Sequence, residues 1–90
     1  MASTLDNLLD ALEDVDDATR EEAAKTLADL GDPSTLQALL VACSDDYWSV
    51  RAYAGCGIGK IGGPKAIEAL ISLFNDPIME VRDQAVEAMA

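Results

Sequence analysis

The feature that most constrains this chain is an internal repeat with a period of 31 residues. When the 90-residue sequence is shifted by that period against itself, 17 of the 59 overlapping positions are identical. An arginine recurs in all three copies and a Gly-x-Pro punctuation in two of them: Arg20, Arg51 and Arg82; Gly31-Asp32-Pro33 and Gly62-Gly63-Pro64. A period of about 20–50 residues indicates stacked units, because one such unit cannot bury its apolar face alone. We therefore expect residues 1–90 to form a single repeat domain.

The pattern predicts two helices in each copy, separated by the glycine and the proline. A Gly past a helix end and a Pro at the first position of the next helix are typical of such a junction. Apolar residues recur at spacings of three and four, as on one face of a helix. They are Ala23, Ala24, Leu27 and Leu30, then Leu36, Leu39, Leu40 and Cys43, and in the next copy Ile67, Leu70, Ile71 and Phe74. We call the half that carries the arginine A and the half after the proline B.

The halves follow one another in the order B-A-B-A-B-A. A B helix is expected over residues 3–13, complete repeats over 18–44 and 47–75, and an A helix over 78–90. No window shows the period of two that indicates a strand. The sequence therefore predicts an all-α fold, an α-α superhelix (solenoid) of about two and a half repeats and six helices.

The repeat resembles a known family. Its units are similar to the HEAT-like repeats of the phycobilisome-lyase type in the motifs Val50-Arg51-x-x-Ala54, Ile61-Gly62-x-Pro64 and Asp76-Pro77-x-x-x-Val81-Arg82, with a second copy over residues 20–40. The resemblance covers nearly the whole chain and implies a HEAT-like solenoid. The family includes scaffold proteins, subunits of bilin lyases, which attach open-chain tetrapyrroles to phycobiliproteins, and deoxyhypusine hydroxylase. The His-Glu pairs that hold the di-iron site of the hydroxylase are missing, because the chain has no histidine.

Composition excludes several classes of function. The chain carries 17 acidic and 6 basic residues, a net charge of −11, and residues 1–46 hold −10 of it. This charge argues against a nucleic-acid partner, since such binding needs clustered Lys and Arg. Without histidine, imidazole catalysis and His-based metal sites are absent. The acids lack the spacing of a Ca²⁺ loop, so we expect no metal and no cofactor.

The compartment follows from what the sequence lacks. No signal-peptide pattern and no membrane-length apolar run is present. We therefore expect a cytoplasmic protein, away from membranes, whose two cysteines are free thiols. Of these, Cys43 falls at a core position, where the other copies have Leu12 and Phe74. We expect its thiol to be buried and inert.

The repeated arginines are interpreted as structural. Arg20, Arg51 and Arg82 each follow, by six residues, an aspartate at the turn from B to A: Asp14, Asp45 and Asp76. We expect each carboxylate to cap its A helix and to pair with an arginine of its own or the adjacent unit. Three equal copies indicate a structural ladder rather than a substrate site.

A glycine-rich stretch within one A helix also invites a functional interpretation. Gly57-Ile58-Gly59-Lys60-Ile61-Gly62 matches the dinucleotide-binding pattern, which requires a preceding strand and a following helix. Here it falls in the second half of an A helix. We interpret its glycines as small residues that allow close helix packing.

Two surfaces are candidates for binding. Trp48, Tyr53 and Cys56 stand where other copies carry mainly polar residues, and we expect them to form an exposed contact patch. B helices line the inner curve of HEAT-type arrays, and the residues expected on that surface include Asp6, Asp10, Gln37, Val41 and Glu68. A surface that is acidic near the N-terminus favours a basic protein segment, whose binding would weaken as salt rises.

These surfaces lead to a non-catalytic protein-interaction or scaffold module. The alternative is a component of a bilin lyase that binds a tetrapyrrole, for which Cys56 and Tyr53 are the candidate contacts; an enzyme is thus the less favoured reading. The last A helix presents Ala85, Val86 and Met89 with no B helix to cover them. We therefore expect a fragment of a longer array or a homo-oligomer formed through that end.

Overall fold

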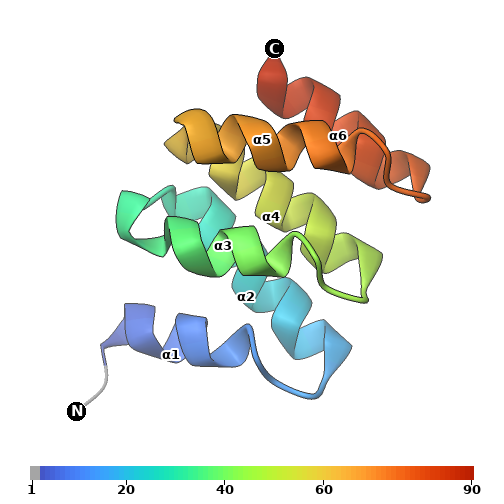
Figure 1. Cartoon of the computed structure of the whole chain (residues 1–90). Coiled ribbons are helices and arrows are strands. Elements are labelled where there is room, and N and C mark those ends of the chain that lie inside the picture. Colours follow the sequence, from blue (N-terminus) through green and yellow to red (C-terminus); the bar gives the residue numbers. More distant parts are fainter. Residues whose placement is uncertain (1–2) are drawn as a thin grey trace.

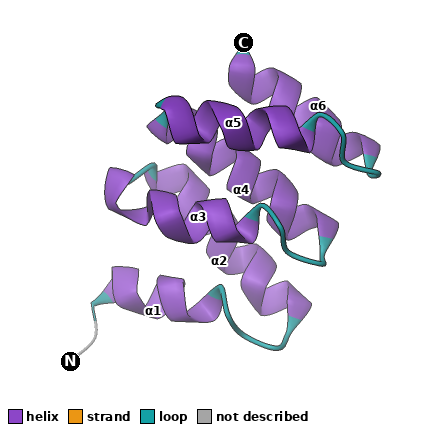
Figure 2. Cartoon of the chain, in the orientation of Figure 1, coloured by secondary structure: helices purple, strands orange, loops and turns teal. Residues whose placement is uncertain are grey.

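The computed structural model describes residues 3–90, which fold into six α-helices and no strand (Figure 2). The B helices are α1 (Thr4–Ala11), α3 (Leu36–Ala42) and α5 (Pro64–Leu73). The A helices are α2 (Asp17–Leu30), α4 (Trp48–Ile61) and α6 (Met79–Met89). A short 3₁₀ turn, Pro33–Thr35, precedes α3. The all-α solenoid predicted from the repeat is confirmed.

The helices lie in two layers, with α1, α3 and α5 in front of α2, α4 and α6 in Figure 1. The shape is elongated, with extents of 38 × 26 × 16 Å. The core lies between the layers and is formed by one face of each repeat. Its fully buried large side chains are Leu27, Leu39, Ile58, Val50 and Val81. Each repeat therefore supplies the hydrophobic surface that its neighbour covers.

The turns between A and B helices follow from the glycines. Gly31 ends α2 with φ 58°, and Gly62 and Gly63 lie between α4 and α5 with φ 77° and 97°. These left-handed conformations favour glycine because other L-residues adopt them only with strain. Asp32 then accepts a hydrogen bond from the backbone N–H of Ser34, with N···O 2.9 Å. The punctuation in the sequence thus reverses the chain at each A-to-B junction.

The A helices approach one another closely at glycines. A Cβ placed on Gly57 would lie 3.2 Å from the Cα of Ala28 on α2. A Cβ on Gly59 would lie 2.7 Å from the Cβ of Ala88 on α6. The glycine-rich stretch is part of helix α4 and has no strand before it. The interpretation as small residues for close packing therefore agrees with these distances.

Several residues expected in the apolar stripes are not buried. Ile67 and Ile71 on α5 are exposed, as are Phe74 just after α5 and Leu30 at the end of α2. Cys43, the equivalent of Phe74 one repeat earlier, is half-buried. The core position assigned to Phe74 is wrong because α5 is the last B helix in the structure, and no further helix covers its outer side.

Candidate interaction site

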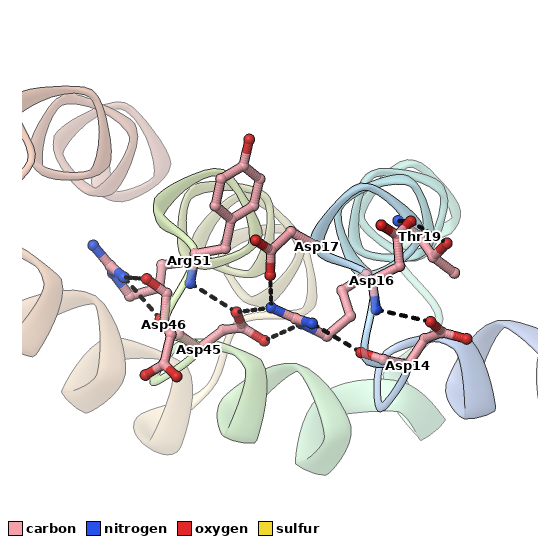
Figure 3. A network of polar contacts seen from close by, with 9 residues as sticks. Asp14, Asp16, Asp17, Thr19, Asp45, Asp46 and Arg51 are labelled. Carbon is pink, nitrogen blue, oxygen red and sulfur yellow. Dashed lines mark hydrogen bonds and ion pairs between the residues drawn. The ribbon is translucent and has the colours of Figure 1, made fainter.

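A ladder of arginines and aspartates runs across the turns that lead from B to A helices, and Figure 3 shows the part of it around Asp14, Asp45 and Arg51. Arg20 donates two hydrogen bonds to the carboxylate of Asp45 in the next repeat, from Nε at 3.0 Å and from Nη2 at 3.2 Å. Its Nη1 donates to the backbone carbonyl of Asp14 at 2.8 Å. Arg20 also pairs with Asp17 on its own helix. The guanidinium of Arg20 thus joins the turn of its own repeat to the turn of the following one.

The second rung repeats this geometry. Arg51 binds the carboxylate of Asp76 through Nε and Nη2, at 2.7 and 3.1 Å. Its Nη1 donates to the carbonyl of Asp45 at 2.7 Å. In the third rung, Arg82 Nη1 donates to the carbonyl of Asp76 at 2.6 Å. Within residues 3–90 no carboxylate accepts a hydrogen bond from Arg82. The last rung therefore has the contact to its own turn but not the one to a following repeat.

The aspartates of the ladder do not occupy the N-cap positions of the A helices, as the sequence had led us to expect. The N-cap residues are Asp16, Tyr47 and Ile78. Each ladder aspartate lies two residues earlier and accepts the N–H of the N-cap residue: Asp14 from Asp16, Asp45 from Tyr47 and Asp76 from Ile78, all at 2.9 Å. The short side chain folds back onto its own turn in this way, as Asx turns do. Its carboxylate remains free to receive the arginine of the preceding repeat.

The charges of the ladder stabilise one another. Burial at Asp76 opposes ionisation, but the hydrogen bonds from Arg51 and from the N–H of Ile78 outweigh it and lower the pKa of this carboxyl. The hydrogen bond to Asp76 in turn raises the pKa of Arg51, and the one to Asp45 raises that of Arg20. Asp76 is therefore charged and paired with Arg51 at neutral pH, which suits a structural role.

A groove lies beside the first rung, between the B helices α1 and α3. It holds about 490 Å³ and is lined by Leu9, Leu12, Glu13, Arg20, Ala38, Val41, Ala42, Ser44, Asp45 and Asp46. Its aliphatic walls come from both helices, and Val41 is 68% exposed. Its polar rim carries three acids, of which Asp45 is already held by Arg20. The groove therefore combines apolar walls with unneutralised negative charge at Glu13 and Asp46.

The B-helix residues expected on a binding surface are all exposed. Asp6 and Asp10 lie on α1, Gln37 and Val41 on α3, and Glu68 on α5. Of these five, Val41 lines the groove, and Glu68 lines a more open hollow of about 600 Å³ between α3 and α5 with Leu40 and Ser72. The sequence did not indicate the groove itself, because the helical pattern of apolar residues predicts core positions for Leu9 and Leu12. The available signal was Ala42, a small residue where the next repeat has the larger Leu73.

The aromatic and thiol residues of α4 are not gathered in one hollow. Trp48 is 38% exposed at the start of α4, where its ring lies 6.5 Å from that of Tyr47. Tyr53 is half-buried against a cluster that contains Ala24 and Val50. Cys56 is half-buried and lines a hollow of about 250 Å³ between α4 and α6. Tyr47 was missed as a neighbour of Trp48, although the two are adjacent in sequence.

Three further observations concern residues 3–90. No three His, Cys, Asp or Glu side chains in this part of the chain gather in a way that could hold a metal ion. None of its helices has the length and apolar character needed to cross a membrane. The Cys43 thiol lies among apolar side chains, and burial raises its pKa to about 12.

Helix pairs that stack repeat upon repeat in two layers are the architecture of α-solenoid repeat proteins. In this chain a repeated Arg–Asp contact joins neighbouring repeats. The family model for HEAT repeats matches residues 1–54 and 38–90, and the chain belongs to this family. A crystal structure of an engineered protein has a similar fold, with a TM-score of 0.75 over 98% of this chain and 22% identity. The chain spans 44% of that protein's length. A search of curated proteins found no match.

Proposed function

We propose that this HEAT-repeat chain is a non-catalytic protein-interaction module and that the groove between α1 and α3 binds a basic segment of a partner protein. The observation that carries the proposal is the groove itself, which holds about 490 Å³ between two B helices. HEAT repeats suggest a scaffold or interaction role as a class. The acidic N-terminal half of the chain adds long-range attraction for a positively charged partner.

The lining of the groove suggests what it would accept. Leu9, Leu12 and Val41 offer aliphatic surface, while Glu13 and Asp46 lie at the rim. A Lys or Arg side chain can lay its aliphatic stem along such walls and keep its charged end beside the carboxylates. The fitting ligand is therefore a segment in which a basic residue is flanked by an aliphatic one.

A second contact is proposed at the start of α4. Trp48 and Tyr47 present adjacent rings there, and aromatic side chains are enriched among residues that dominate binding energy. Tyr53 is more deeply packed and would contribute less. The variant Trp48→Ala should weaken partner binding without changing the groove.

The experiment compares two charge-reversed variants in affinity capture from the source cell, followed by a direct measurement of Kd with each captured protein. Glu13→Lys combined with Asp46→Lys reverses the rim of the groove. Asp29→Lys combined with Glu80→Lys makes the same charge change at exposed positions on A helices. A partner should bind the wild type and the control, lose at least about tenfold in affinity for the groove variant, and bind more weakly as salt rises. Equal binding of one partner to both variants would refute the assignment.

The phycobilisome-lyase type and its bilin chemistry are less well supported. The hollow at Cys56 holds about 250 Å³, below the roughly 300–1,000 Å³ of sites that enclose small-molecule ligands. This size favours the interaction module. Mixing the chain with a bilin and recording the visible spectrum tests the alternative directly, because a bound tetrapyrrole would shift its absorption.

A further inference from the structure

The C-terminal end of the array presents an apolar face that is covered in the other repeats. Val86 on α6 is 61% exposed, whereas its equivalents one and two repeats earlier, Gly55 and Ala24, are buried. Met89 is 42% exposed, whereas Ile58 and Leu27 at the same position are fully buried. The difference arises because later helices pack on α2 and on α4, whereas no described helix follows α6 (Figure 1).

The N-terminal end has the opposite deficiency. Within residues 3–90 the B helix α1 is not preceded by an A helix, and none of its residues is buried. Leu8 is half-buried, although its equivalents Leu39 and Leu70 are 0% and 2% exposed. Ala11 is half-buried as well, whereas the residues at its position in the other repeats, Ala42 and Leu73, are buried. One end thus lacks a B helix and the other end offers one.

The ladder ends at the same two places. Arg20 and Arg51 each bind the carboxylate that lies 25 residues further along the chain. Arg82 has no such carboxylate among the described residues, and the carboxylate of Asp14 accepts no arginine there. In the 31-residue register, Asp14 is the equivalent of Asp45 and Asp76. It is therefore the residue type and position that Arg82 would meet in a following repeat.

The side chains at the two ends also fit in size. Within the chain, a Cβ on Gly55 would lie 3.0 Å from Cδ1 of Leu73 and 3.8 Å from Cδ2 of Leu70, so these two residues cover it. The same register would place Ala11 and Leu8 of a following unit over Val86. The pair Gly55 with Leu73 and the pair Val86 with Ala11 hold the same number of side-chain carbons, with large and small exchanged. A contact of this volume can form without leaving a cavity.

We propose that a second copy of this chain docks head to tail, with its α1 placed on α5 and α6 of the first copy as the next B helix of the solenoid. Arg82 of one copy binds the carboxylate of Asp14 in the other, and Val86 and Met89 pack under its Leu8 and Ala11. The contact joins two different faces, so it propagates rather than closing on itself. The proposal does not depend on the groove or on its partner.

The test is sedimentation of the 90-residue chain across a concentration series at about 0.15 M salt, where the Debye length of about 8 Å screens the repulsion between copies. The weight-average mass of the wild type should rise above 9.5 kDa with concentration. Arg82→Asp and Asp14→Arg should each lower the association constant more than about tenfold, because each places like charges at the junction. An equimolar mixture of these two variants restores opposite charges at every junction and should associate again.

A third variant tests whether a loss of self-association could come from misfolding. Val86→Glu puts a charge on an exposed helix position, so the monomer should keep its helical circular dichroism while self-association is lost. A wild type that stays monomeric at about 1 mM would overturn the proposal. So would a mixture of the charge variants that stays monomeric. Association that is insensitive to Asp14→Arg would instead indicate contact between two C-terminal ends, which also contradicts head-to-tail docking.

Discussion

The three glycines of α4 allow one substitution to be tested in three different environments. Replacing a helical Gly by Ala gains up to about 1 kcal/mol from helix propensity, and this gain is the same at each site. What differs is the neighbour that the new methyl group meets. At Gly57 it would lie 2.9 Å from Cδ1 of Leu39 and 3.2 Å from the Cα of Ala28. The second of these atoms is backbone and cannot rotate away.

We therefore expect Gly57→Ala to be clearly destabilising. Forcing a methyl group into a close-packed interface costs about 1–3 kcal/mol, and a backbone neighbour places the cost in the upper half of that range. After the propensity gain, the free energy of unfolding should fall by about 1–2 kcal/mol. For a domain of this size the melting temperature falls by about 4–8 °C per kcal/mol.

Gly55→Ala is the matched control. Its methyl group would meet Cδ1 of Leu73 at 3.0 Å, the far end of a flexible side chain that can change rotamer. We expect this variant to be neutral or slightly stabilised. Gly59→Ala should lie between the two: its methyl group would lie 2.7 Å from the Cβ of Ala88, which cannot rotate away, but α6 is the last described helix and can shift as a whole.

The measurement is urea denaturation followed by circular dichroism at one low protein concentration. From the most to the least stable variant, the predicted order is Gly55→Ala, Gly59→Ala and Gly57→Ala. If all three variants were stabilised by a similar amount, helix propensity alone would explain them. The close approach of α2 and α4 at Gly57 would then have no energetic weight.

Other predictions concern the ladder and isolated buried groups. Arg51→Gln should lower the free energy of unfolding, measured by urea denaturation, by about 2 kcal/mol, because it leaves a buried carboxylate without its charged partner. Arg82→Gln removes only a hydrogen bond to a carbonyl and should lower it by well under half as much. The lowered pKa of Asp76 means that its contribution to stability is present above the unfolded-state value of about 3.9 and is lost as pH falls through the folded-state value; an acid titration of stability should show this loss, and Asp76→Asn should flatten it. Among the described residues the buried Ser49 hydroxyl has no hydrogen-bond partner, so Ser49→Ala should raise the free energy of unfolding by about 1 kcal/mol and the melting temperature with it. Because burial raises the pKa of Cys43 to about 12, its thiol should stay unmodified by a disulfide reagent at pH 8 until the chain is unfolded in urea.

The helices and their order could be predicted because the period, the glycines and the prolines are local signals. The Arg–Asp pairs could be predicted only in part. The spacing of six residues indicated that both groups belong to one turn, but it left open which unit supplies each partner. That choice depends on the stacking of repeats: Arg51 takes the carbonyl from its own turn and the carboxylate from the next.

Burial could not be transferred from one repeat to another. Phe74 stands at a position that was expected to be buried, and periodicity carries no information on whether a later helix covers it. The exposure of Val86 and Met89 was expected from the missing B helix, but Ala85, which was expected to be uncovered with them, is fully buried. The groove was missed for a related reason. Its opening depends on the distance between α1 and α3, two helices that contact each other little and are placed by the A helices behind them.

Asp45 and Asp76 each make two kinds of contact, and this has a consequence for folding. Asp45 holds its own turn through the N–H of Tyr47 and the preceding repeat through Arg20. The turn that starts an A helix and the contact that stacks two repeats therefore cannot form independently. In a linear array, such coupling raises the nearest-neighbour term relative to the stability of one repeat. The chain should consequently unfold in a single cooperative transition, and amide exchange in the central repeat should occur only through global unfolding.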